Sequence, residues 1–288
     1  MADLSPPVWL AAWHWRPEVL LVVGALGSAY GSGWWRLRNA RRRGGRSTWQ
    51  LIAYMTGLVT LGAALISPID HLADVLFAAH MIQHLLLTMA AAPLLLLGNP
   101  LSACLWGLPR RVRRLAGRLL TRNAPLRKLL WTLTLMPVAW FLHVGTLWAW
   151  HFPDAYQAAL RNHFLHDLEH LTFFGTALLF WWPIIGPAPR LHGRVHPGFG
   201  IVYLLAATGQ NTLLGAVIAL PERVLYPYYT APPRLFGLSP LDDQAAAGGI
   251  MWISGHMYLL PILLLVAKIA RQEDPTSRRR KAAPREGA

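Results

Sequence analysis

The sequence is poor in cysteine and in charge. Cys104 is the only cysteine among 288 residues, which excludes an internal disulfide and any metal or redox site built from paired cysteines. Charged residues make up 14% of the chain, against about 25% in an average soluble domain. With 54% hydrophobic residues and a mean hydropathy of +0.34, the composition excludes both an ordinary soluble domain and a disordered chain.

The charges that are present are mostly positive. Lysine and arginine number 27 against 13 aspartate and glutamate residues, which gives a formal net charge of +14. A chain that is both apolar and basic is either a nucleic-acid binder or a membrane protein with basic loops. The positions of the charges decide between these two classes.

Seven apolar segments are long enough to cross a bilayer, whose core of about 30 Å requires roughly 20 residues per helix. They run over Pro17–Trp35, Trp49–Ile66, Val75–Gly98, Leu129–Trp150, Phe164–Ile185, Phe199–Leu220 and Ala246–Lys268. They predict an all-α, polytopic membrane protein with a seven-transmembrane-helix bundle over residues 17–268. We expect residues 1–16 to form a short extracytoplasmic segment and residues 269–288 a basic, disordered cytoplasmic tail.

The basic residues gather on one side of the predicted bundle. Twenty-three of the 27 lie in the loops after the first, third and fifth segments and in the tail, whereas ten of the 13 acids lie on or near the other side. By the positive-inside rule, the N-terminus is outside and the C-terminus is cytoplasmic. The basic loops then set the topology and contact anionic lipid headgroups, so we expect no nucleic-acid partner.

Two pairs of histidines have the i, i+4 spacing that places both rings on one helix face: His80 with His84, and His166 with His170. Two imidazoles in this arrangement can share one metal ion. Both segments enter the membrane from the outside, so we expect the pairs at similar depth. A single buried histidine is more often a hydrogen-bonded core residue, but two matched pairs favour a metal site.

The predicted metal ligands also include one histidine on the fourth segment and one on the seventh. The full set is His80, His84, His143, His166, His170 and His256. Glu169, Asp167, His151 and His163 are expected to support these ligands or, with Asp70 and His71, to line the access route from outside.

Imidazole with thioether nearby suits copper, which is the metal that we predict. Met81 and Met257 each follow a histidine in the chain. Adjacent residues point about 100° apart on a helix, so we expect these two methionines to pack rather than to bind metal.

Three other functions remain compatible with these residues. Two histidines on different helices can ligate one haem, as in a redox membrane protein. The run His166-Asp-Leu-Glu169-His170 matches the H-x-x-E-H pattern of inverted zinc proteases, so a metal-dependent membrane enzyme is a second alternative. A scaffold that binds its partner without any metal is the third.

Several motifs follow one another in a fixed order along the chain. They are His80-x-x-x-His84 with Pro93-Leu-Leu-Leu-Leu-Gly98, Trp140-Phe-Leu-His143, Trp150-His151, Pro153-Asp-Ala-Tyr156, His166-Asp-Leu-Glu-His170, Asp242-Asp243-Gln244 and Gly248-Gly249-Ile-Met251-Trp252. Over roughly residues 15–270 they resemble the CtaG family of cytochrome c oxidase assembly factors, in the multi-span form found in Bacillus.

The resemblance implies a multi-pass protein of the plasma (inner) membrane that helps to assemble a haem–copper oxidase and is not an enzyme in the ordinary sense. It further implies a copper chaperone that supports insertion of copper into the CuB centre, with the catalytic subunit of the oxidase as partner. The resemblance does not assign the metal ligands, so the residues named above rest on their placement and chemistry.

Overall fold

The computed structural model describes residues 13–40, 47–121, 123–188, 190–193, 195–232 and 235–273. All regular structure within these ranges is helical, which confirms the all-α part of the predicted fold class. Most of the predicted extracytoplasmic segment and of the predicted disordered tail lies outside the described residues. The last helix continues to Glu273, five residues beyond the predicted end of its span at Lys268.

Five helical segments are long and apolar enough to cross a membrane, and there are six candidates if a bent pair of helices counts as one span. The five are α3 (Thr48–Ile66), the run of α5 (Phe77–Leu85), η1 (Leu86–Ala91) and α6 (Ala92–Leu97), α12 (His163–Ile185), α13 (Pro197–Ala219), and the run of α14 (Pro240–Ser254), η3 (Gly255–Tyr258) and α15 (Leu259–Glu273). The bent pair is α9 (Pro125–Leu133) with α10 (Met136–His151), at 71° to each other.

These six spans coincide with six of the seven predicted segments. The remaining one, Pro17–Trp35, lies within the helix α2 (Pro17–Ala40), which is not among the helices that qualify as spans in the described part of the chain. Seven spans and the orientation of the termini therefore stay predictions.

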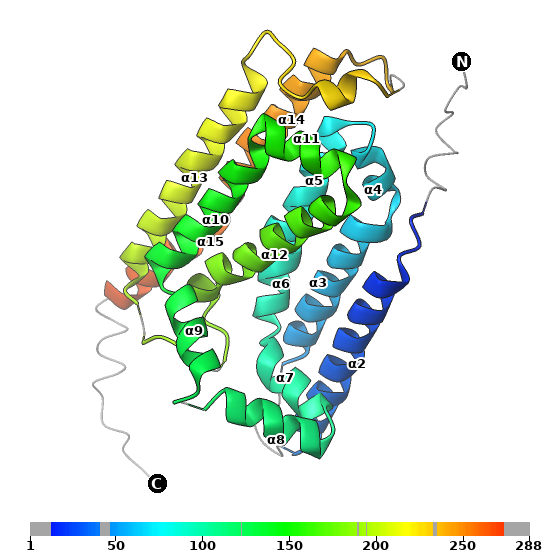
Figure 1. Cartoon of the computed structure of the whole chain (residues 1–288). Coiled ribbons are helices and arrows are strands. Elements are labelled where there is room, and N and C mark those ends of the chain that lie inside the picture. The colour runs from blue at the N-terminus through cyan, green and yellow to red at the C-terminus, as the bar shows by residue number, and fades with distance from the viewer. Residues whose placement is uncertain are drawn as a thin grey trace.

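Short helices close the two ends of the bundle (Figure 1). At one end lie α4 (Pro68–Ala73), α11 (Pro153–Arg161) and η2 (Pro227–Thr230), beside the start of α5 and the end of α10. We call this the histidine end, and it is the end that the sequence predicts to be outside. The opposite end carries α7 (Pro100–Gly107) and α8 (Arg110–Leu119).

The outward faces of the spans are apolar. Phe141, Leu171, Val202 and Leu264 each leave about two thirds of their surface exposed, at 65–70%. Large apolar side chains exposed in this way would be costly in water and are favourable against lipid tails. The surface as well as the interior therefore fits a multi-pass membrane protein.

Small residues let the helices α2 and α7 approach closely. A Cβ atom added to Gly33 of α2 would overlap the carbonyl oxygen of Ala103 in α7, and one added to Gly107 would overlap that of Ala29. Close approach of this kind is a common way of packing helices in membranes, where burial of apolar surface gives no advantage over lipid. It fixes α2 against α7 at the end opposite the histidines.

The last span fixes the start of α5. The buried carboxylate of Asp243 in α14 accepts hydrogen bonds from the backbone N–H groups of Phe77 at 2.7 Å and Ala78 at 2.9 Å. A negative charge at a helix N-terminus is favourable because it meets unpaired N–H groups and the positive end of the helix dipole. The neighbouring Gln244 binds the backbone of Leu225 and Arg223, which anchors the loop before α14.

A π-helical turn, η1, lies in the middle of the α5–α6 span. In this turn the Ala92 N–H donates to the carbonyl of Leu87, five residues earlier. The next residue, Pro93, has no N–H and cannot donate to Thr88 in the same way. The carbonyl of Thr88, which such a bond would use, instead accepts from Trp181 Nε1 of α12 at 2.9 Å. The π turn thus ties α12 to this span one helical turn after His84.

Candidate metal site

Four histidines converge between α5 and α12 at the histidine end. The ring centroids of His80 and His84 are 4.2 Å apart, as are those of His166 and His170. Across the two helices, His80 lies 5.2 Å from His166, and His84 lies 5.4 Å from His170. The two predicted pairs therefore face each other at one depth.

Two sets of side chains could each hold one ion. The nitrogens of His80, His84 and His170 lie within 4.8 Å of one another, as do the ligand atoms of His80, His166 and Glu169. His80 Nε2 and His166 Nε2 are 3.2 Å apart. Two nitrogens bound to one ion at about 2.0 Å in tetrahedral geometry are about 3.3 Å apart, so this separation suits shared ligation.

Three buried members of the cluster lack hydrogen-bond partners. Both ring nitrogens of His84, both of His170 and both carboxyl oxygens of Glu169 are buried without a partner. An unsatisfied polar group in a buried place costs about 1–3 kcal/mol, and a charged one more. His84 Nε2 and Glu169 Oε1 are also 3.7 Å apart, too far for a hydrogen bond. A cation in the first set would give a partner to one nitrogen of His84 and one of His170, and a cation in the second set would do so for a carboxyl oxygen of Glu169.

Two tyrosines orient His80. Its Nδ1 lies 2.5 Å from the Tyr156 hydroxyl and 3.0 Å from the Tyr229 hydroxyl, and these hydroxyls are 3.3 Å apart. Tyr229 donates its only proton to the carbonyl of Ala73 at 3.1 Å. Tyr156 can then donate to Tyr229 and accept from His80 Nδ1–H, which leaves the lone pair on His80 Nε2 facing the cluster.

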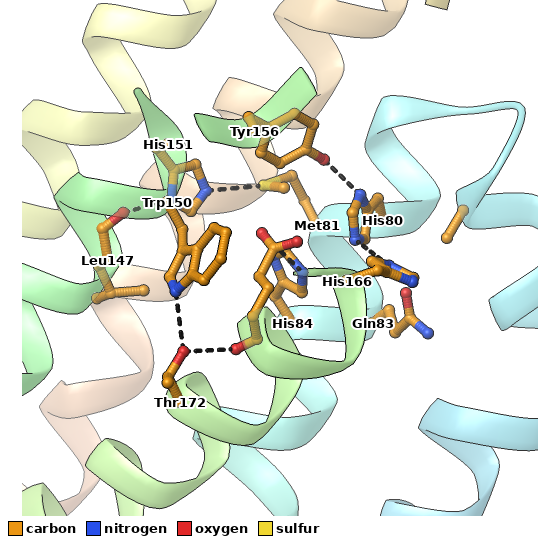
Figure 2. A network of polar contacts seen from close by, with 12 residues as sticks. His80, Met81, Gln83, His84, Leu147, Trp150, His151, Tyr156, His166 and Thr172 are labelled. Atoms are coloured by element: carbon orange, nitrogen blue, oxygen red, sulfur yellow. Dashed lines mark hydrogen bonds and ion pairs between the residues drawn. The ribbon is translucent and has the colours of Figure 1, made fainter. Parts of the chain in front are cut away.

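Burial and the adjacent Tyr229 raise the pKa of Tyr156 well above its ordinary value, so the hydroxyl stays protonated. The chain of hydrogen bonds from His80 to Ala73 therefore fixes the tautomer of the imidazole, as the indirect partners of metal-bound histidines commonly do. Figure 2 shows Tyr156 on one side of His80 and His166 on the other.

Other contacts hold α12 and α10 around the cluster. Trp150 Nε1 of α10 donates to Thr172 Oγ1 at 2.8 Å, and Thr172 in turn donates to the backbone carbonyl of Glu169 (Figure 2). His151, at the end of α10, lies with its ring centroid 6.2 Å from that of His84. Of the predicted supporting residues, Glu169 and His151 thus adjoin the four histidines.

The remaining predicted residues do not join the cluster. His143 is buried on α10, where its Nδ1 contacts Thr176 Oγ1 at 3.2 Å and its ring packs on Phe180. His256 is exposed on η3, and His163 is exposed at the start of α12. Asp167 is exposed and forms a two-pronged ion pair with Arg16, at 2.8 and 2.9 Å.

A second group of possible ligands lies nearer the surface, formed by His14, His71 and Asp74. The buried Asp70 beside it accepts hydrogen bonds from His14 Nδ1 at 2.8 Å and from Gln83 Nε2 at 2.6 Å. Asp70 and His71 are where the sequence places the access route. Asp70 thus connects this group to α5, one residue before His84.

Sequence reasoning missed Tyr156, Tyr229, His14 and Asp74 as parts of this region. Tyr156 stands in the motif Pro153-Asp-Ala-Tyr156, which contributes to the family resemblance but does not predict what the tyrosine does. The other three lie in connecting segments, where no periodic pattern relates a side chain to the spans.

These observations define a multi-pass helical membrane protein with a buried cluster of histidines and a carboxylate near one end of the bundle. A family model described as cytochrome c oxidase caa3 assembly factor (Caa3_CtaG) matches residues 28–272. The chain belongs to this family, which confirms the resemblance that the motifs suggest.

Three mycobacterial proteins, each described as uncharacterised, are similar to the chain. One from Mycobacterium leprae is 27% identical over 276 residues, and those from Mycobacterium bovis and Mycobacterium tuberculosis are each 29% identical over 266 residues. The matches cover 90% of this chain but 40% of each relative, so the chain spans two fifths of the length of these proteins. No solved structure matches the chain.

Proposed function

We propose that this protein binds copper at the cluster of His80, His84, His166, His170 and Glu169, and supports its insertion into the CuB centre of a haem–copper oxidase. The observation that carries the proposal is the set of buried, unpartnered nitrogen and oxygen atoms on His84, His170 and Glu169. The role in oxidase assembly is supported by the match to a family described as cytochrome c oxidase caa3 assembly factor. Copper is here the cargo, delivered to the oxidase subunit that carries the catalytic centre.

The donor set fits an exchangeable copper ion. Imidazole is a good ligand for copper, and a neutral ring is released more readily than a thiolate. Two overlapping sets share His80, so one ion has more ligands within reach than it requires. Excess ligands allow stepwise replacement, which transfer to another protein needs.

The group of His14, His71 and Asp74 is the proposed point of arrival. It combines imidazole and carboxylate, and Asp70 beside it is hydrogen bonded through Gln83 to the helix that carries His80 and His84. In the orientation that the basic loops favour, this group faces the outside of the plasma membrane.

The opposite end fits a cytoplasmic membrane surface. α8 carries five arginines and exposes the apolar side chains of Val112, Leu115 and Leu119. A basic amphipathic helix of this kind lies in the headgroup region and attracts anionic lipid. Anionic lipid is therefore the proposed second partner.

The function is tested with His84→Ala combined with His170→Ala. Neither ring has a hydrogen bond to lose, so the double variant removes the proposed ligands without breaking a hydrogen bond. The matched control is His143→Ala, which removes an equally buried imidazole from α10. Detergent-purified protein should lose most of its bound copper only in the double variant, and that variant should fail to restore oxidase assembly in a host deleted for this protein.

An unchanged copper content in the double variant would refute the proposed site. Retained oxidase assembly despite lost copper would favour the scaffold without a metal. A Soret absorption band in the purified protein would favour the haem alternative.

A further inference from the structure

A buried thioether and a buried imidazole face each other beside the cluster. Met81 Sδ of α5 lies 3.4 Å from His151 Nε2 at the end of α10. Met81 is fully buried, and 4% of His151 is exposed. Figure 2 shows the two side chains pointing at each other from different helices.

The hydrogen bonding of His151 fixes which nitrogen carries the proton. Its Nδ1 lies 2.7 Å from the carbonyl oxygen of Leu147, and a carbonyl can only accept, so Nδ1 must be the donor. In the neutral imidazole, Nε2 then has a lone pair and no hydrogen. Methionine sulfur has no hydrogen either, so two electron-pair donors face each other.

A second proton on His151 is an unfavourable way to resolve this contact. It would place a positive charge in a buried position, which is costly without an anion beside it. The rings in contact with His151 belong to His84, Tyr156 and Phe173, and none of these is negatively charged at neutral pH. A bound cation satisfies both lone pairs without charging the imidazole.

The spacing of the two atoms suits a shared ion. Bonds of about 2.0 Å to nitrogen and about 2.3 Å to sulfur, at a tetrahedral angle, place the two ligand atoms about 3.5 Å apart. Thioether sulfur is a soft ligand that selects Cu(I) over Zn(II) and other harder ions. The pair therefore differs in preference from the nitrogen and oxygen ligands of the main cluster.

His84 is the member of the cluster that adjoins the pair. Its ring centroid is 6.2 Å from that of His151 and 5.4 Å from that of His170, and both of its ring nitrogens are unpartnered. It is the side chain placed to serve either position, and thus to pass an ion from one to the other.

We propose that Met81 and His151 form a second copper position, selective for Cu(I), adjoining the histidine cluster through His84. This inference deepens the proposed function and rests on it. No electron transfer is required, because the ion arrives and leaves as Cu(I) and only its ligands change.

The test replaces Met81 by leucine, which keeps an apolar side chain of similar volume and removes the sulfur. The matched control is Met89→Leu, a buried methionine in η1 of the same span that packs in a separate part of the core. Each purified protein is loaded with Cu(I) under reducing conditions and examined by X-ray absorption and by competition with a Cu(I) chelator. Zn(II) binding is measured in parallel.

Wild-type protein and Met89→Leu should show copper–sulfur scattering at about 2.3 Å. Met81→Leu should lose that scattering and bind Cu(I) at least about tenfold more weakly, since even indirect partners of a metal contribute this much. Its Zn(II) binding, supplied by the main cluster, should stay within twofold of the wild type (about 0.4 kcal/mol).

Copper surrounded only by nitrogen and oxygen in the wild type, or sulfur scattering that survives Met81→Leu, would overturn the inference. In both cases the proposed function stands if the His84→Ala and His170→Ala double variant still loses copper. Wild-type protein that binds no copper at all would overturn both.

Discussion

Replacing Tyr156 by phenylalanine should weaken metal binding without touching a ligand. The hydroxyl of Tyr156 is the nearer of the two acceptors for His80 Nδ1, at 2.5 Å against 3.0 Å for Tyr229. Without it, His80 keeps only the longer bond, and its ring is free to turn or to adopt the other tautomer. Loss of such a partner commonly lowers metal affinity by 10–100-fold, or about 1.4–2.8 kcal/mol.

The loss of metal affinity should grow with the number of tyrosine hydroxyls removed. Because Tyr229 remains as an acceptor in Tyr156→Phe, this variant should bind metal about tenfold more weakly than the wild type. The double variant, Tyr156→Phe with Tyr229→Phe, should bind metal about a hundredfold more weakly. The control is Tyr258→Phe, because the Tyr258 hydroxyl is buried with no hydrogen-bond partner and contributes no bond to lose.

Competition with a chromophoric chelator, on protein in detergent micelles, measures the dissociation constants. Equal affinities for Tyr156→Phe and wild type would refute the role of the hydrogen-bond chain. An equal loss in Tyr258→Phe would show that any buried Tyr→Phe change weakens the site through stability. The midpoint of thermal unfolding, recorded on the same samples, separates the two effects.

Two further predictions concern how the bundle holds the site, and thermal unfolding followed by tryptophan fluorescence checks both. Asp243→Ala leaves the N–H groups of Phe77 and Ala78 without their buried acceptor and should lower the free energy of unfolding by at least about 2 kcal/mol. Asp242→Ala, at the exposed capping box with Ser239, should lower it by about 1 kcal/mol or less. Equal losses in the two variants would contradict the anchoring of α5 by Asp243. Gly33→Ala forces α2 away from α7 and should destabilise the protein by about 1–3 kcal/mol. Gly24→Ala, whose added Cβ would meet nothing within 4 Å, should stabilise α2 slightly. A Gly33→Ala variant as stable as the wild type would contradict the close packing.

The two histidine pairs could be predicted because their geometry is local. The i, i+4 spacing places His80 with His84, and His166 with His170, on single helix faces whatever the rest of the bundle does. Their equal depth follows from span length and direction. The rotation of each helix about its own axis is not local, since it depends on every side chain packed around it.

For that reason the predicted inclusion of His143 has no support in the structure, where α10 turns this residue toward Thr176 and Phe180. The same rotation of α10 brings His151 against Met81. On α5 alone, Met81 points away from the face of His80. Only the position of α10 reveals that it points at another imidazole.

The contact between Asp243 and the start of α5 joins residues that are 166 positions apart in the chain. During synthesis, α5 and α12 enter the membrane well before α14 is made, so both histidine pairs are present while the N-terminus of α5 is still uncapped. The site reaches its final geometry only when the last span docks. A partly synthesised chain would therefore lack the finished histidine cluster, and only molecules that have completed the bundle would present it.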